Sequence, residues 1–179
     1  MGLRPAKTFR KPDRQPWCRY SRSKPRKSYI KAMPHADLHQ FRMGEMKEDF
    51  DTQIDLVCKE PIIIRDNAIE SARQSSNKRL EKEMAGEYFF MVRPFPHHVI
   101  RENKMISGAG ADRLQKGMRR SFGRPTDKAA IMEKGKVVFT VYTYKKHAKL
   151  VKEALTIAQR KLSGKYRVEV FPSSRTKAS

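Results

Sequence analysis

The chain has 179 residues, which is enough for one domain of ordinary size with a hydrophobic core. Forty Lys and Arg residues stand against 19 Asp and Glu residues, giving a formal net charge of +21. This charge favours a polyanionic partner, above all nucleic acid, because basic side chains that bind phosphates release condensed counterions. No run approaches the ~20 apolar residues of a spanning helix and the N-terminus lacks a signal-peptide apolar region, so we expect an intracellular protein without a membrane partner.

Residues 1–49 are expected to form a basic, extended N-terminal arm. The first 31 residues hold eleven basic side chains and one acid, and several prolines interrupt any helix there. Phe9, Trp17, Tyr20 and Tyr29 lie between the charges, and this mixture on an extended backbone suits phosphate pairing combined with base stacking. A disordered basic tail is the alternative. The RNA-binding residues predicted in the arm are Arg4, Lys7, Arg10, Arg14, Arg19, Arg22, Lys24, Arg26 and Lys27.

Residues 50–171 are expected to form a globular domain, with a polar tail at 172–179. Gln53 to Cys58 alternates in the manner of a half-buried strand, and Ile62 to Ile64 is a short apolar run. A helix is predicted from Asn67 to Ala85, with Asn67 as N-cap and Gly86 as the stop. Its predicted buried stripe consists of Ile69, Ala72, Ser76, Leu80 and Met84.

The second half of the domain predicts more strands and one further helix. The expected strands are Tyr88 to Arg93, His97 to Arg101, Ala129 to Glu133, Lys136 to Tyr144 and a last one through Tyr166, Val168 and Val170. A tight turn is expected at Lys134-Gly135, and the helix runs from Lys146 to Leu162. These elements predict an α+β fold, with both long helices packed on one face of a mixed β-sheet.

The segment 102–125 is too long for an ordinary connection and predicts a functional loop. It holds four glycines and carries a net positive charge, so it is expected to be exposed or bound to something anionic. A dinucleotide-type phosphate loop is one alternative, but Arg113 stands where the third glycine is required. A plain surface loop is another. We favour an RNA-contacting extension whose arginines Arg119, Arg120 and Arg124 bind phosphates.

This loop and the residues before it resemble one ribosomal family. The matching runs are Pro94 to Arg101, Asn103-Lys104-Met105, Gly108 to Arg113, Gly117-Met118-Arg119 and Phe122-Gly123. They are similar to the universal L-sixteen protein of the large ribosomal subunit, in its archaeal and eukaryotic "ten-e" form. The resemblance covers about residues 2–171, although the arm up to about Lys27 matches less well.

The resemblance implies a compact "hammerhead" α+β domain that binds large-subunit RNA between the central protuberance and the base of the factor-binding stalk. It implies a cytoplasmic, non-enzymatic protein without cofactor, whose partners are ribosomal RNA, transfer RNA and neighbouring ribosomal proteins. The loop is then expected to reach towards the peptidyl-transferase region and the acceptor arms of transfer RNA. Carried over to this chain, the residues near the transfer RNA are Lys104, Ser107, Gly108, Gly110, Arg113 and Lys116.

Enzymatic and metal sites have weak support in the sequence. His35 and His39 could share a helix face, but Pro34 and the basic flanks argue against a buried metal pocket. Of His97 and His98, one ring is expected to face inwards and one outwards. Cys58 is expected to be a small core residue. An RNA-modifying enzyme and a general DNA-compacting protein remain the alternatives to a structural RNA-binding protein.

Overall fold

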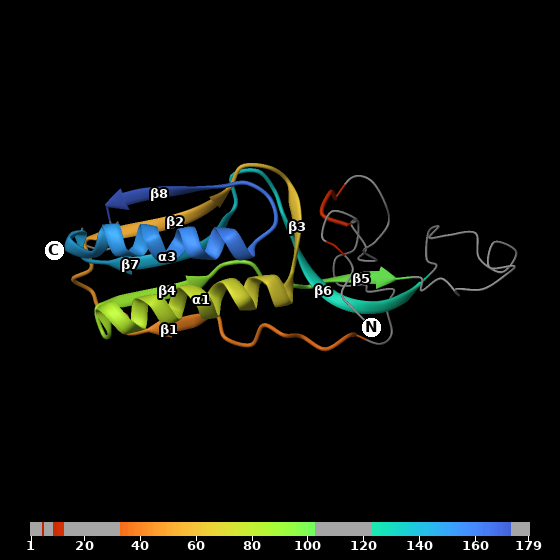
Figure 1. Cartoon of the computed structure of the whole chain (residues 1–179), viewed down its shortest axis with the longest axis horizontal. Helices are drawn as coiled ribbons and strands as arrows, with labels where there is room; N and C mark the ends of the chain where they lie inside the picture. The colour runs from red at the N-terminus through yellow and green to blue at the C-terminus, as the bar shows by residue number, and fades with distance from the viewer. Residues whose placement is uncertain (1–4, 6–8, 13–32, 103–122, 173–179) are drawn as a thin grey trace, which may run out of the picture.

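The computed structural model of the chain describes residues 5, 9–12, 33–102 and 123–172. Within these residues lie two long helices, one short 3-10 helix and eight strands (Figure 1). The helices are α1 (Asp66–Met84), η2 (Lys145–His147) and α3 (Ala148–Lys161). The strands are β1 (Arg42–Gly44), β2 (Thr52–Cys58), β3 (Ile62–Arg65), β4 (Tyr88–Val92), β5 (His98–Glu102), β6 (Arg124–Met132), β7 (Val137–Thr143) and β8 (Tyr166–Pro172).

The strands form two sheets. A five-stranded sheet has the order β1-β4-β7-β2-β8, and a three-stranded sheet has the order β3-β6-β5. The predicted α+β class is confirmed, but the prediction of one mixed sheet is wrong, since every strand pair in the described part of the chain is antiparallel. Consecutive strands joined by short links such as Lys134-Gly135 pair antiparallel. The helices α1 and α3 connect strands that are not neighbours in a sheet, so they add no parallel pair.

Three stretches of chain pass from one sheet to the other side by side. Strands β4, β7 and β2 are neighbours in the larger sheet, and their continuations β5, β6 and β3 keep the same order in the smaller one. At the junction, the amide of Cys58 donates to the carbonyl of Lys136 (2.9 Å) and the amide of Arg93 to that of Val138 (3.0 Å). Pro61, which cannot donate a ladder hydrogen bond, stands where β2 gives way to β3.

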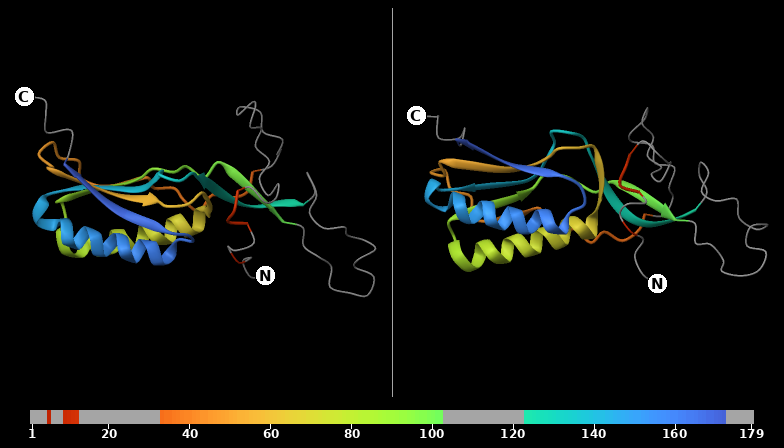
Figure 2. Two further views of the ribbon diagram at one scale, coloured as in Figure 1. Left: turned by 90° about the horizontal axis from the view of Figure 1, so that it is seen from above. Right: turned by 45° about the horizontal axis from the view of Figure 1, so that its top comes forward.

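Both long helices lie on one face of the five-stranded sheet, while the other face carries no described helix (Figure 2). The predicted stripe of α1 is confirmed, because Ile69, Ala72, Ser76, Leu80 and Met84 are all buried. Ser76 is tolerated there since its hydroxyl donates to the carbonyl of Ala72 at 2.7 Å. On α3 the buried residues are Val151, Ala154, Leu155 and Ala158. Beneath the helices Phe90 and Phe139 meet edge to face at 5.2 Å.

The start of α1 differs from the prediction. Asn67 is not the N-cap; the helix begins at Asp66, whose Oδ1 accepts the amide of Asn67 (2.9 Å) and whose Oδ2 accepts the amide of Asp37 (3.0 Å). A carboxylate in the first turn is favoured by the helix dipole. Burial nevertheless raises the pKa of Asp66, against the opposing effect of the two amide donors.

Two strands differ from the sequence-based boundaries. Strand β1 lies inside the segment assigned to the arm. It is only three residues long and is held by pairing with β4, so its sequence has no alternation of apolar and polar residues from which a strand could be predicted. Strand β6 begins at Arg124, five residues before the predicted Ala129, because its polar first half pairs with β5. Glu102 and Arg124 therefore face each other across a ladder and are strand residues, and Pro172 ends β8.

Substitution of Gly44 tests how β1 is held against β4. Its φ is +78°, and a Cβ there would lie 2.3 Å from the carbonyl oxygen of Tyr88 in β4. Gly44→Ala is expected to lower the free energy of unfolding by at least ~2 kcal/mol, because backbone strain and overlap add. Gly86→Ala is the matched control: φ is +74° but nothing lies within 4 Å of the new Cβ, so a loss of about 1 kcal/mol is expected. Urea unfolding of both variants gives the comparison, and equal losses would contradict the predicted overlap.

Candidate nucleic-acid interface

Two of the predicted RNA-binding residues, Arg10 and Arg124, lie within the described part of the chain, and both side chains are exposed. Both lie at the three-stranded sheet, Arg10 beside β3 and Arg124 at the start of β6. The remaining predicted RNA-binding residues lie outside the described residues: Arg4, Lys7, Arg14, Arg19, Arg22, Lys24, Arg26, Lys27, Arg119 and Arg120. The same holds for the residues expected near transfer RNA, namely Lys104, Ser107, Gly108, Gly110, Arg113 and Lys116.

Phe9 fixes a short piece of the N-terminal region on the three-stranded sheet. Its side chain is 2% exposed and packs with Ile63, Ile100 and Ala129. The guanidinium carbon of Arg65 lies 4.3 Å from the centroid of the Phe9 ring, which is cation–π geometry. The amide of Ile63 donates to the carbonyl of Arg10 at 2.8 Å. The exposed side chains of Arg10 and its neighbour Lys11 are thereby held at the surface of this sheet.

Strands β5 and β6 form a hairpin that extends away from the helices (Figure 1). Its last described pair is Glu102 with Arg124, so residues 103–122 connect the two strands at the end far from α1 and α3. Inside the hairpin, Arg101 is buried, and Thr126 donates to the carbonyl of Ile100 at 3.2 Å. Backbone pairing and a buried side chain therefore fix the position of the hairpin up to Glu102.

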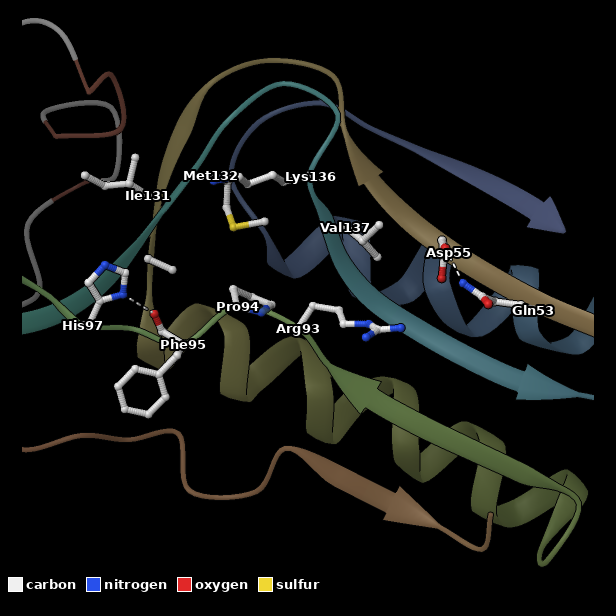
Figure 3. A pocket seen from close by; sticks show the side chains of 11 residues that line it. Gln53, Asp55, Arg93, Pro94, Phe95, His97, Ile131, Met132, Lys136 and Val137 are labelled. Atoms are coloured by element: carbon white, nitrogen blue, oxygen red, sulfur yellow. Dashed lines mark hydrogen bonds between the residues drawn. The ribbon is translucent and has the colours of Figure 1, made fainter. Parts of the chain in front are cut away.

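A groove that sequence analysis missed lies at the junction of the two sheets, on the side away from the helices (Figure 3). It has a volume of about 560 Å³, and residues of β2, β6, β7 and the β4–β5 link line it. The polar and aromatic residues that line it are Gln53, Asp55, Arg93, Phe95, His97 and Lys136. The run Pro94-Phe95-Pro96 was the sequence feature that could have indicated this groove. An aromatic residue between two prolines has a restricted backbone, and this one belongs to no alternating or helical hydrophobic pattern.

The adjacent histidines differ in exposure, as expected, although neither is fully buried. His97 is exposed and His98 half-buried, with their ring centroids 4.1 Å apart. The rings of His35 and His39 lie 5.7 Å apart. Within residues 5, 9–12, 33–102 and 123–172, no three His, Cys, Asp or Glu side chains are grouped as metal ligands would be. None of the helices described is long and apolar enough to span a membrane.

Helix α3 offers a second basic surface. Its exposed cations are Lys149, Lys152, Arg160 and Lys161, and the exposed Glu153 among them lies 3.6 Å from Arg79 of α1. Lys146, just before the helix, is held by Glu87 with an Nζ to Oε2 distance of 2.9 Å. Glu87 also accepts from His147, and these two partners lower its pKa. Glu87 thus holds two side chains of η2 beside this surface.

The aromatic strands supply core rather than a wide stacking surface, as expected. Phe90 and Phe139 are fully buried beneath the helices. On the opposite face, Phe89 and Tyr142 pack with Phe50 and are buried too. Cys58 is a core residue as predicted, and burial raises the pKa of its thiol to about 11, so it stays protonated at neutral pH.

Comparison with known proteins decides between the remaining alternatives. Residues 17–169 match the family model described as ribosomal protein L16p/L10e. The protein named "Large ribosomal subunit protein uL16" from Sulfolobus acidocaldarius is 42% identical over 173 residues, which cover 95% of this chain and 94% of the relative. Its namesakes from Halorubrum lacusprofundi (40% identical, 95% of each chain) and Archaeoglobus fulgidus (41% identical, 86% of this chain and 88% of the relative) agree.

The chain belongs to the L16p/L10e family of ribosomal proteins. The predicted resemblance is confirmed, and the relatives just named are archaeal. Members of the L16p/L10e family are structural, non-enzymatic proteins, so neither an RNA-modifying enzyme nor a DNA-compacting protein describes this chain. The basic surfaces of β6, α3 and the Arg10 region are therefore surfaces of a ribosomal protein.

The Phe9 contact yields a stability prediction. Phe9→Ala removes a buried ring and the face over which Arg65 lies, so the free energy of unfolding should fall by about 3 kcal/mol. Because Arg10 would no longer be held, exchange of the Ile63 amide should accelerate. Phe171→Ala serves as control, since Phe171 is 43% exposed on the edge strand β8 and should change little. Hydrogen exchange with mass spectrometry measures both, and unchanged protection of Ile63 in Phe9→Ala would contradict the anchoring.

Proposed function

We propose that this chain is a structural constituent of the large ribosomal subunit that binds ribosomal RNA and helps to organise the transfer RNA sites. The observation that carries the proposal is the family match over residues 17–169, together with relatives named as large-subunit proteins along nearly the whole chain. Such a protein works in the cytoplasm, where ribosomes act. Neighbouring ribosomal proteins are further partners under this proposal.

The placement of charge supports ribosomal RNA as the main partner. Arg10 and Lys11 are exposed beside β3, Arg124 is exposed on β6, and α3 carries a row of lysines. Lys136 and Lys146, by contrast, are paired with Glu133 and Glu87. A protein with a net charge of +21 gains most by neutralising phosphates on several sides at once. The arm residues predicted above, from Arg4 to Lys27, are proposed as additional phosphate contacts.

The β5–β6 hairpin supports the role of residues 102–125 near transfer RNA. Its ladder ends at Glu102 and Arg124, at the end of the hairpin that is far from the helices. Sites placed on firm secondary structure are positioned more accurately than sites on loops alone. We therefore propose that the body binds ribosomal RNA and that Lys104, Ser107, Gly108, Gly110, Arg113 and Lys116 lie closest to transfer RNA.

Sedimentation tests the ribosomal assignment. Cell extract is run through a high-salt sucrose gradient, and the chain is followed by mass spectrometry together with large-subunit RNA. Stoichiometric recovery with the large subunit is expected, because a specific complex also has packing and base contacts that release no counterions, whereas nonspecific phosphate binding is lost as the salt concentration rises. Recovery only among free proteins, at moderate as well as at high salt, would contradict the proposal.

Removal of part of the loop tests its separate role. Deleting Gly108 to Lys116 should leave the unfolding transition of the domain nearly unchanged, because the described core lies in other residues. Translation by subunits that carry the deletion should fall severalfold. A Gly/Ser segment of the same length is the matched control and shows whether chemistry or length matters. Unfolding of the domain on deletion would contradict the proposed separation of loop and core.

A further inference from the structure

We propose that the outward face of α3 lies along the backbone of double-helical RNA and that the neighbouring helix α1 does not. The proposed contacts, called the α3 stripe below, are the exposed residues Lys149, Lys152, Thr156 and Arg160. This inference rests on the proposed function, because it takes the chain to be bound to RNA. It goes further in naming the form of the RNA and the helix that meets it.

The α3 stripe runs along one side of its helix. Its four residues are spaced by three, four and four positions, so their side chains leave the helix in nearly the same direction. The buried residues of α3, from Val151 to Ala158, lie on the opposite side, so folding points the stripe away from the sheet. From Lys149 to Arg160 the helix rises ~16 Å. Phosphates of one strand of a DNA duplex follow each other every ~3.4 Å along its axis, so a stripe of this length can meet several of them.

Charge distinguishes α3 from α1. The two helices lie side by side on the same face of the five-stranded sheet (Figures 1 and 2). Helix α1 carries four acidic and four basic residues, so its charges balance. Helix α3 carries four basic residues and a single acid, Glu153. Since both helices bury one side against the same sheet, packing on the sheet does not account for the excess of cations on α3.

The acid on α3 does not neutralise the stripe. Glu153 follows Lys149 by four residues, a spacing at which opposite charges can pair on a helix. Its Oε2 instead lies 3.6 Å from Nη2 of Arg79 on α1. Among the residues that the structure describes, no ion pair is formed by Lys149, Lys152 or Arg160. The folded body therefore leaves the cations of the stripe for an external anion.

The first turn of α3 shows that this arrangement is unfavourable for the helix alone. Lys145 and Lys146 stand in η2 directly before α3, Lys149 follows in its first turn, and no acid stands in that turn. The amide end of a helix carries a partial positive charge, so cations there are destabilising. Glu87 offsets Lys146 at 2.9 Å. A polyanion along the stripe would supply the negative charge that Lys145 and Lys149 lack.

The lack of stacking rings favours a duplex over unpaired RNA. Helices α1, η2 and α3 contain no Phe, Tyr or Trp. Tyr144, directly before η2, has Nζ of Lys146 5.3 Å from its ring centroid and donates its hydroxyl to Asp49 at 2.6 Å. Unpaired RNA is bound by stacking of its bases on aromatic side chains, whereas double-helical RNA is bound mainly through phosphates and ribose hydroxyls. A row of cations without rings fits the second kind of partner.

Thr156 allows the RNA to come close to the middle of the stripe. Its side chain is short, and its hydroxyl donates to the carbonyl of Lys152 at 2.8 Å, so it lies against the helix. The hydroxyl oxygen still has a lone pair with which it can accept from a ribose 2′-hydroxyl. Because DNA lacks this hydroxyl, the contact favours RNA.

Acetylation of lysines in intact large subunits tests which helix is covered. Mass spectrometry compares the modification rate of each lysine in the subunit with its rate in the free chain. Lys149 and Lys152 should react severalfold more slowly in the subunit and regain their rate after ribonuclease digestion. The exposed Lys78 and Lys82 of α1 are the matched control and should react at nearly the same rate in both forms.

Two outcomes of this measurement overturn the inference while leaving the proposed function standing. One is protection of Lys149 and Lys152 that is no greater than that of Lys78 and Lys82. The other is protection that survives ribonuclease digestion, which identifies a protein as the occupant. Failure of the chain to sediment with the subunit overturns the proposed function itself.

Binding by the full chain tests the form of the RNA. A labelled RNA hairpin stem, the DNA stem of the same sequence and an unpaired oligouridylate are compared over a range of salt concentrations. The double variant Lys149→Ala/Lys152→Ala should lower the slope of log affinity against log salt for the RNA stem by about 2, because each phosphate contact contributes ~0.9. Its affinity for the RNA stem should fall about tenfold near physiological salt, and its affinity for oligouridylate should fall less.

Lys78→Ala/Lys82→Ala is the matched control, because it removes two exposed lysines from α1. It should leave the slope for the RNA stem unchanged. Thermal unfolding confirms that both variants are folded, since alanine is a good helix former. Equal changes of slope in the two variants overturn the inference. A larger loss for oligouridylate than for the RNA stem, or an equal loss for the DNA and RNA stems, also overturns it.

Discussion

The continuity of three strands across two sheets is the constraint on which the rest of the structure depends. Strands β4, β7 and β2 continue into β5, β6 and β3 in the same order, so three connections of the chain join the two sheets. The larger sheet is fixed by α1 and α3, which bury one face of it. The smaller sheet is held by those shared strands, by the packing of Phe9, and by Ile62, Ile64, Ala130 and Met132, which belong to the main core. The position of the smaller sheet therefore depends on the same core that fixes the larger one.

This division separates stability from recognition. Apolar burial is concentrated between the helices and the five-stranded sheet, where Phe90, Phe139 and Leu155 are fully enclosed. The charged residues proposed to bind RNA lie instead on the smaller sheet and on the outer side of α3. A substitution such as Arg124→Ala is therefore expected to change RNA binding without disturbing the core, whereas Leu155→Ala is expected to affect both.

Patterns with a strong hydrophobic period were predictable from the sequence, and residues without one were not. The stripe of α1 from Ile69 to Met84 and the strand through Ile54 and Leu56 followed directly from spacing. Strand β1 and the first half of β6 could not be found, since they are held by pairing with distant partners rather than by their own side-chain pattern. The groove could not be predicted either, because Gln53, Arg93 and Lys136 come from three separate segments of the chain that only the fold brings together.

The segment from Phe9 to Pro12 is docked on the three-stranded sheet, and this has a consequence for the cations that it carries. Because Phe9 is buried and the amide of Ile63 donates to the carbonyl of Arg10, the side chains of Arg10 and Lys11 start from a backbone whose position is already set. A cation on such a backbone loses only side-chain freedom when it meets an anion, whereas a cation on a free tail loses backbone freedom as well. Folding of the body has thus already met part of the entropic cost of any contact that these two residues make.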